Sequence, residues 1–373
     1  MGLLLATRDP RRQIGTALAT PIARWMIALL VWSTLSVPGA IWAGGAYAQV
    51  QDFAKAIGMA LVAVAAVRGQ RDVGRLATVY FIGAAIYAFI VLTRFHVGGG
   101  GDWRLSSLYY YDANDFATFA VSAIPLGLYL ALRRGPITTR LAAVAAVAAL
   151  GLSFIWSGSR GGFLALLVAA IYWVLRFRAV RAPWRVVSIG VAALIFVSTA
   201  SSEFWAQMKT ITSPEKDYNV TGETGRMEIW KRGIGYMVSY PVFGVGAGDF
   251  GTAEGRLSSL ASRQEYNTGL KWSEAHNSFV QVGAELGIPG LIIFLGMLLG
   301  VLRALRASKL RARAPDTFDP DADLLAQSMS AAFVGFVVGA FFLSLAYREP
   351  LYTLVALGAA VEKVSRSSQL SLG

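Results

Sequence analysis

The sequence predicts an all-α integral membrane protein with about ten transmembrane helices, both termini in the cytoplasm and one large, partly helical periplasmic loop. The chain has 373 residues, of which 55% are hydrophobic and 15% are charged, and its mean hydropathy is +0.52. Soluble domains contain roughly 45–50% apolar and about 25% charged residues, so this composition indicates lipid as the solvent. We expect a single polytopic membrane domain over residues 1–373, with the large periplasmic loop at 202–280.

The transmembrane segments are predicted from apolar runs, since a helix that crosses a bilayer needs about 20 mostly apolar residues. These runs lie at 24–43, 53–68, 75–94, 115–132, 139–156, 161–177, 185–201, 281–302, 324–345 and 350–362. The last run is the shortest. Several runs are rich in glycine and alanine, as closely packed membrane helices tend to be.

Lysine and arginine are concentrated in alternate loops, which predicts the orientation of the chain. With the N-terminus in the cytoplasm, most of the 34 basic residues fall in cytoplasmic segments, whereas the short outer loops contain Arg94, Arg104, Arg160 and Arg348. The net charge of +12 is therefore a signal of topology, and we expect no nucleic-acid partner.

The composition also limits the chemistry that the protein can use. Cysteine is absent, which excludes disulfides and thiolate metal sites. The two histidines, His96 and His276, leave little room for a histidine-rich metal centre. We expect no cofactor.

Two outer segments are longer than the others. Residues 95–114 contain a glycine run followed by an aromatic cluster, and residues 202–280 are too long for a simple connection. Within this large loop, apolar residues recur at steps of three and four, namely Met227, Trp230, Ile234 and Met237. This period predicts an amphipathic helix that lies on the membrane surface or on the other helices.

Arg160 lies in a tight outer turn, Ser-Gly-Ser-Arg-Gly-Gly at 157–162, where the following helix begins. The glycines let a ligand approach the backbone, and the free N–H groups and dipole of the helix favour an anion beside the guanidinium. The alternative is an arginine that snorkels from the helix end to the interface. We favour the anion site, because a positive charge on the outer side runs against the topology rule.

The amphipathic helix begins at Arg226, one position off its apolar stripe. An anion contact and a surface salt bridge with Glu223 or Glu228 are equally compatible with this position. Lys231 and Arg232 are expected to be ordinary solvated charges.

His276 lies where the large loop re-enters the membrane, and it is the only base in that loop that titrates near neutral pH. A structural role and a catalytic role both remain open for it. Glu285 follows nine residues later, which at 100° per residue places it on the opposite helix face, about 13 Å further along. We therefore expect Glu285, on the face of Ser278 and Gln281, to be either a packing carboxylate or one that supports the site through another residue.

Two further motifs carry polar or glycine residues. Asp112, Asn114 and Asp115 stand at the entrance of a predicted span, where they could cap the helix, contact a sugar or acceptor, or hold a divalent cation. Capping is the simplest of the three. The Gly244-x-Gly-x-Gly248 run is weak evidence for phosphate binding, because no strand precedes it.

Taken in order, these motifs resemble those of the bacterial O-antigen ligase and O-antigen polymerase superfamily. The matching stretches are DANDFA at 112–117, SGSRGG at 157–162, GRMEIW at 225–230, PVFGVGAGDF at 241–250 and AHNSFVQVGAELGIPG at 275–290. Each is loose alone, but their order is specific, and the resemblance covers roughly residues 105–300. The aspartate motif has Ala113 where proline is common in the family.

The resemblance implies a GT-C-like membrane glycosyltransferase that takes a glycan from undecaprenyl diphosphate on the periplasmic face of the inner membrane, without a metal and with inversion. By position, His276 corresponds to the family's catalytic histidine, and Arg160 and Arg226 correspond to its arginines for the donor diphosphate. We further expect substrate contacts from Asn277, Arg104, Asp112, Asn114, Asp115, Trp230 and Gly246.

Several acceptors are compatible with this chemistry. The compact outer loop favours ligation of O-antigen to lipid A core in lipopolysaccharide biosynthesis, while a growing glycan (a polymerase) or a protein hydroxyl (an O-oligosaccharyltransferase) remain alternatives. A lipid or polysaccharide transporter is a different class, and it would be expected to carry charges near the membrane midplane. The clustering of reactive residues on one outer face favours the enzyme.

Overall fold

The computed structural model describes residues 9–95, 103–105, 108, 111–213, 217–263, 273–314 and 318–370, and these residues form helices and no strand. The prediction of an all-α membrane protein is confirmed. The longer helices are α2 (Pro10–Leu18), α3 (Pro21–Ser36), α4 (Ala43–Ala66), α5 (Gln70–Arg94), α6 (Ala113–Leu132), α7 (Ile137–Ser157), α8 (Arg160–Arg176), α9 (Ala182–Thr199), α10 (Ser202–Lys209), α12 (Arg226–Ser239), α13 (Phe250–Leu257), α14 (Ser278–Ala312), α15 (Pro320–Ala340) and α16 (Glu349–Leu370). Short elements are η1 (Val37–Gly39), η2 (Thr210–Thr212), α11 (Tyr218–Thr221) and η4 (Ala261–Arg263).

Among the described residues, 8 helices are long and apolar enough to cross a membrane: α3 with η1, α4, α5, α6, α7, α9, α14 and α15. Two predicted spans are not in this set. The span at 161–177 corresponds to α8, which has only 17 residues, and the span at 350–362 lies in α16, which carries Glu349, Glu362, Lys363 and Arg366. The count of about ten spans and the N-in, C-in orientation therefore stay predictions.

The chain divides into two compact units, each made of three separate stretches. The first unit comprises Met1–Ala66, Ser213–Val301 and Ala340–Ala359, and the second comprises Val67–Thr212, Leu302–Gly339 and Ala360–Gly373. The division falls inside the large loop, after Thr212, which the sequence did not indicate. The prediction of one membrane domain stays a prediction.

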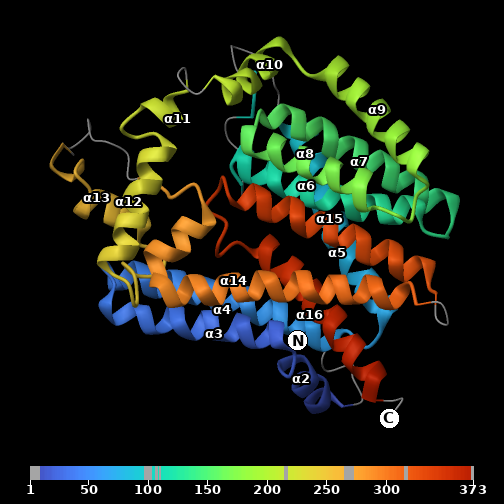
Figure 1. The fold of residues 1–373 in the computed structure, drawn as a ribbon, viewed down its shortest axis with the longest axis horizontal. Helices are drawn as coiled ribbons and strands as arrows, with labels where there is room; N and C mark the ends of the chain where they lie inside the picture. The colour runs from blue at the N-terminus through green and yellow to red at the C-terminus, as the bar shows by residue number, and fades with distance from the viewer. Residues whose placement is uncertain are drawn as a thin grey trace. The chain divides into compact units, whose positions relative to one another are not determined.

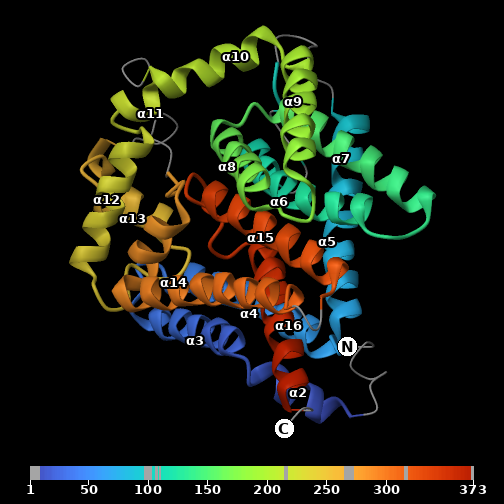
Figure 2. The same cartoon turned by 45° about the vertical axis from the view of Figure 1, so that its right-hand side comes forward.

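In the first unit, α3, α4 and the first part of α14 run alongside one another (Figures 1 and 2). Small residues on α14 allow this close approach, because Gly296 and Gly300 face Trp25 and Ile22 of α3. A larger residue at Gly296 would place its Cβ 3.0 Å from the Trp25 ring.

The helix α14 is broken near its start, and the break explains how the large loop is anchored. Gly287 has non-helical dihedral angles (φ 69°, ψ −171°), and Pro289 has no N–H to donate to the carbonyl of Glu285. The N–H of Ile288 donates instead to Pro241 O at 2.9 Å. The carbonyls of Ala284 and Glu285 consequently lose their helical donors and need others.

The second unit is centred on α6, in which 72% of the residues in an 18-residue stretch are buried. Gly127 of α6 faces Phe81 of α5 and Val147 of α7, so the three helices pack closely there. By contrast, α9 contains no buried residue. A helix with this apolar composition and no protein cover is expected to face lipid.

Candidate functional site

The first unit positions His276 immediately before α14. Its φ of +47° makes it the one non-glycine residue with a positive φ among the residues that the structure describes. Histidine is among the residues that reach this region, but the conformation is uncommon and persists only when its surroundings hold it. The side chain is half-buried. A strained backbone of this kind is a recurrent feature of active sites.

Three parts of the first unit hold the backbone at His276. The N–H of His276 donates to Ser344 Oγ at 2.9 Å, and Trp230 Nε1 of α12 donates to the carbonyl of Ala275 at 3.0 Å. Ser278 Oγ donates to Leu343 O at 2.7 Å and accepts from Leu345 N at 2.9 Å. The loop, the helix start and the segment after α15 are thus joined at the histidine.

The segment after α15 corrects one predicted boundary. The apolar run at 324–345 predicts a helix to its end, but α15 stops at Ala340 and residues 341–348 are not helical. The hydrogen bonds of this segment to Ser278 and His276 replace the helical ones. Sequence reasoning missed Ser344, because an apolar run gives no sign of where its backbone leaves the helix.

Asn277 caps α14. Its Oδ1 accepts from Phe279 N at 2.9 Å and from Val280 N at 3.1 Å, and the residue is only 2% exposed. This burial favours a capping role over direct substrate contact. The substrate contact of Asn277 stays a prediction.

The predicted amphipathic helix exists as α12, and Arg226 is its first, half-exposed residue. The buried side, however, is formed by Ile229, Gly233 and Tyr236, not by the predicted stripe. Met227 and Ile234 of that stripe are 41% and 49% exposed. The helix therefore packs on the protein through one face and leaves an apolar face uncovered, as a helix at a membrane surface does.

The prediction for Arg232 was wrong, because this arginine is a partly buried member of a polar cluster. Its Nε donates to both carboxylate oxygens of Glu254, at 2.9 and 3.0 Å, and its Nη2 donates to Oε2 at 2.5 Å. Tyr236 Oη donates to Glu254 Oε1 at 2.8 Å. The side chains of Arg232 and Glu254 are 16% and 5% exposed. Lys231 is exposed, as predicted, and it pairs with Glu228.

The electrostatics of this cluster follow from its geometry. The hydrogen bonds to Glu254 raise the pKa of Arg232 above its ordinary value. Burial, and then the hydrogen bond to Glu254, raise the pKa of Tyr236. Arg232 is therefore charged and Tyr236 neutral at physiological pH, and the cluster ties α13 to α12 as a charge-assisted network.

The glycine-rich turn at 241–250 donates hydrogen bonds to the carbonyls that the break in α14 exposes. Val245 N donates to Ala284 O at 2.8 Å and Gly246 N donates to Glu285 O at 3.0 Å, replacing the lost helical donors. Glycine is required at Gly244 (φ +65°), because a Cβ there would collide with the backbone of Ala284 and Glu285.

The Glu285 side chain completes the anchor of the turn. The carboxylate is 1% exposed and accepts from Gly248 N at 2.9 Å and Phe250 N at 3.4 Å. Glu285 is thus the packing carboxylate that the helical period predicts. The backbone N–H groups from Val245 to Phe250 all donate to protein acceptors, which favours packing over phosphate binding, and the substrate contact of Gly246 stays a prediction.

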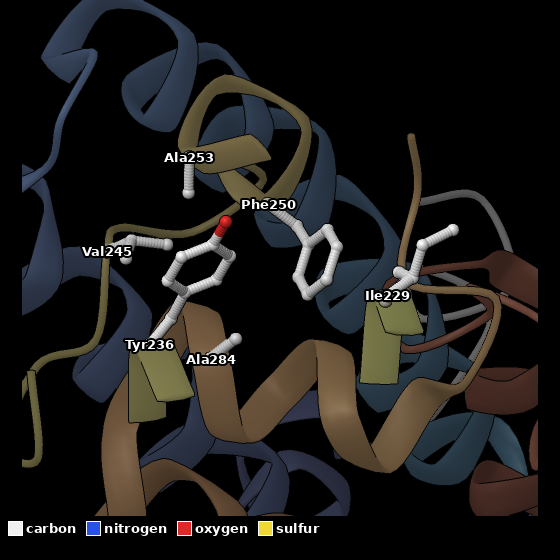
Figure 3. Close-up of a cluster of buried hydrophobic side chains, with 7 residues drawn as sticks. Ile229, Tyr236, Val245, Phe250, Ala253 and Ala284 are labelled. Carbon is white, nitrogen blue, oxygen red and sulfur yellow. The ribbon is translucent and has the colours of Figure 1, made fainter. Parts of the chain in front are cut away.

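Buried apolar side chains pack between α12, α13 and α14. Figure 3 shows Tyr236 of α12 beside Phe250 of α13, with Ala284 of α14 beneath them. Their rings are 6.0 Å apart in an edge-to-face arrangement. Ile229, Val245, Ala253 and Ala275 belong to the same cluster. The loop therefore has a small hydrophobic core of its own, joined to α14.

The second unit places Arg160 at the first position of α8. Ser159 caps this helix by accepting from Gly162 N at 3.1 Å, and Arg160 Nη1 donates to Thr210 Oγ1 at 2.7 Å. The half-buried arginine therefore holds the first part of the large loop, a role that neither sequence interpretation included. Anion binding by Arg160 stays a prediction.

Other predicted residues lie near this turn. Gly158, with φ +58°, is packed against the Trp103 ring and Arg104 Cβ, and Leu105 N donates to Trp156 O at 2.9 Å. Gly162 in turn faces Ala117, one turn into α6. The structure thus brings Arg104, Arg160 and the start of α6 together in the second unit.

Asp112 caps α6, as its position predicts. Its Oδ1 accepts from Asn114 N and from Asp115 N, each at 2.7 Å. Among the residues that the structure describes, no group of three or more His, Cys, Asp and Glu side chains is placed to hold a metal ion. Sugar contacts of Asp112, Asn114 and Asp115 stay predictions. The glycine run at 98–101 and His96 lie outside the described residues.

Each unit therefore carries its own part of the predicted site: His276, Asn277, Arg226, Trp230 and Gly246 belong to the first, and Arg160, Arg104, Asp112, Asn114 and Asp115 to the second. Apolar helices of spanning length indicate a multi-pass membrane protein, and a strained histidine lies at the end of the large loop between α9 and α14. The model of the O-antigen ligase family matches residues 144–295. The resemblance to the O-antigen ligase and polymerase superfamily is confirmed.

The matched region contains Arg160, Arg226, Gly246 and His276, but it begins after the aspartate motif at 112–115. It is narrower than the predicted resemblance at 105–300. A comparison with curated proteins finds no match.

Proposed function

We propose that the protein transfers a glycan from undecaprenyl diphosphate to an acceptor hydroxyl on the periplasmic face of the bacterial inner membrane. The family match over residues 144–295 carries this proposal, because it spans the histidine and both arginines of the motif set. The geometry at His276 supports it, since this histidine is half-buried, has a strained backbone and lies directly before α14, a helix long and apolar enough to cross a membrane.

The reaction is a single displacement at the anomeric carbon. His276 accepts the proton of the acceptor hydroxyl while its oxygen forms the new bond to that carbon. The bond from the anomeric carbon to the diphosphate oxygen breaks, and undecaprenyl diphosphate leaves with the electron pair. The configuration inverts. A positioned base of this kind accelerates such a reaction roughly 10²–10⁴-fold.

Arg160 and Arg226 bind the donor diphosphate in this proposal. Their guanidinium groups neutralise the charge that grows on the leaving group, as bidentate donors to phosphate oxygens do. Both arginines stand at the first position of a helix, α8 and α12, where the helix dipole adds to their positive potential. The reaction then needs no metal ion.

The acceptor is lipid A core in the form of the proposal that we favour, which makes the protein an O-antigen ligase of lipopolysaccharide biosynthesis. A reconstituted reaction tests this directly: purified full-length protein and a glycan on undecaprenyl diphosphate, with and without lipid A core, with products sized on a gel. A single shifted band that requires lipid A core supports the ligase. A ladder formed from donor alone identifies a polymerase instead.

Matched variants and a chelator make the same assay specific for the mechanism. Arg226→Gln should reduce transfer strongly, whereas Lys231→Gln on the same helix, in an exposed pair, should leave it nearly unchanged. Equal loss in both variants would remove the diphosphate role of Arg226. Activity that a chelator abolishes and Mg²⁺ restores would contradict the metal-free mechanism.

A further inference from the structure

A pocket lined by both arginines and apolar side chains lies in the second unit, among loops that join its helices. Its volume is about 450 Å³, within the roughly 300–1,000 Å³ typical of small-ligand sites. The lining comes from three separate segments: the loop after α6, the loop after α8 and the connection from α14 to α15. Five of the six helices that these loops join are long and apolar enough to cross a membrane, namely α6, α7, α9, α14 and α15. We therefore expect the pocket at the end of those helices, at the depth of lipid headgroups.

Three arginines converge on this pocket, one from each segment: Arg134, Arg178 and Arg313. Arg133, the neighbour of the first, is engaged elsewhere and stacks on the Tyr129 ring at 5.6 Å. The backbone beside Arg178 is fixed, because Ala179 N donates to Gln327 Oε1 of α15 at 3.2 Å. The fold therefore brings these three arginines together, which basic loops do not do in general.

Arg313 is only partly satisfied within the protein. Its Nε donates to Asp323 Oδ1 at 2.8 Å, with side chains 29% and 7% exposed. Its Nη2 is buried and has no hydrogen-bond partner among the residues that the structure describes. A buried guanidinium nitrogen without an acceptor costs free energy, and an anion in the pocket would supply that acceptor.

The charge and the rim of the pocket indicate the class of ligand. Asp323 neutralises Arg313. Among the described lining residues, the exposed Arg134 and Arg178 outnumber the one other carboxylate, Asp321. The apolar rim includes Leu132 and Phe318, which are 42% and 61% exposed. A phosphate between arginines, with apolar surface beside it, matches the headgroup and first carbons of a phospholipid better than a soluble ion.

We propose that this pocket binds the phosphate group of an anionic membrane phospholipid, through Arg134, Arg178 and Nη2 of Arg313. The site is distinct from His276, Arg226 and Arg160, and the proposal does not depend on the proposed transferase function. By the positive-inside rule its loops are those predicted to face the cytoplasm, where anionic headgroups and basic loops meet.

Native mass spectrometry of the purified full-length protein tests this, with titration by phosphatidylglycerol, by phosphatidylcholine and by inorganic phosphate. The double variant Arg134→Gln/Arg178→Gln removes the two exposed arginines and leaves the Arg313–Asp323 pair intact. The control Arg176→Gln/Arg181→Gln removes two exposed arginines from the ends of α8 and α9 that do not line the pocket. Both variants lose the same charge, so general surface attraction falls equally.

Phosphatidylglycerol should bind wild type more tightly than phosphatidylcholine does. At about fivefold per arginine, the pocket variant should bind it roughly 25-fold more weakly, while the control stays within about threefold. Equal losses in the two variants, or equal binding of both lipids, would overturn the proposal. Binding of inorganic phosphate without phosphatidylglycerol would assign the pocket to a soluble phosphate and overturn the lipid assignment.

Discussion

Replacing Glu254 with alanine should open the large loop locally, because it leaves the partly buried guanidinium of Arg232 without its carboxylate. The Arg232 side chain is 16% exposed, and in the variant it would keep the carbonyl of Glu223, at 3.1 Å from Nη1, as an acceptor. Removing one partner of a buried ion pair costs about 3–5 kcal/mol. Since part of Arg232 reaches solvent, we expect the lower end, about 3 kcal/mol.

Two further variants divide this cost into its parts. Glu254→Gln keeps an acceptor for Tyr236 and for one arginine nitrogen but removes the charge, which should cost about 1–2 kcal/mol. Glu228→Ala breaks the exposed pair with Lys231, whose side chains are 40% and 67% exposed. Such a pair contributes about 0–1 kcal/mol, so this variant is the control.

Amide hydrogen exchange of α12 and α13 in the purified full-length protein measures the effect as local opening. At about 1.4 kcal/mol per tenfold, Glu254→Ala should raise exchange in both helices roughly 100-fold, while amides of α6 in the second unit stay unchanged. Exchange in Glu254→Ala no faster than in Glu228→Ala would refute the reasoning. The pair would then be a solvated contact, as the sequence first suggested.

Three other predictions follow from the first unit. His276→Ala and His276→Asn should each lower glycan transfer at least about 100-fold, with amide hydrogen exchange of α12 unchanged. Asparagine is included because it tolerates a positive φ. Retention of most activity would remove the base assignment. Gly244→Ala should lower the stability of the protein by about 2 kcal/mol or more through strain and collision, as measured by thermal unfolding. Gly235→Ala, at an open position on α12, should instead stabilise the protein by about 0.5–1 kcal/mol. Similar effects of the two substitutions would contradict the packing of the turn. Burial raises the pKa of Asp249 above its ordinary 3.8, so its contribution to stability is present in acid and is lost as pH rises through the raised pKa. Relative to Asp249→Asn, wild type should therefore become less stable from about pH 4 upward. A stability that rises with pH would exclude burial as the dominant cause of the pKa shift.

The features that the sequence predicts correctly are those decided by local rules. Asp112 caps α6 because a carboxylate before a helix meets the N–H groups two and three residues on. The position of Glu285 follows from 100° per residue, and the structure places its carboxylate on Gly248 and Phe250. Apolar length predicts most spans for the same reason. No knowledge of tertiary partners is needed for any of these.

The features that the sequence misses depend on partners far along the chain. The sequence predicts that Arg232 is solvated, because its partner Glu254 lies 22 residues away on another helix. The buried stripe of α12 includes Gly233 and Tyr236, and neither a glycine nor a tyrosine counts as a strong apolar position. Ser344 is missed because nothing in an apolar run marks its hydrogen bond to His276.

The anchoring of the candidate site follows from the hydrogen bonds of one broken helix. Pro289 and the redirected N–H of Ile288 leave two carbonyls of α14 without helical donors. The turn at 241–250 supplies those donors, and the glycines are needed because its backbone must approach α14 closely. This contact fixes the end of α12, whose Trp230 then holds the carbonyl beside His276. A proline and glycine break in a membrane helix thereby determines where the loop returns, and the strain at His276 persists because the loop, the helix cap and Ser344 all constrain it.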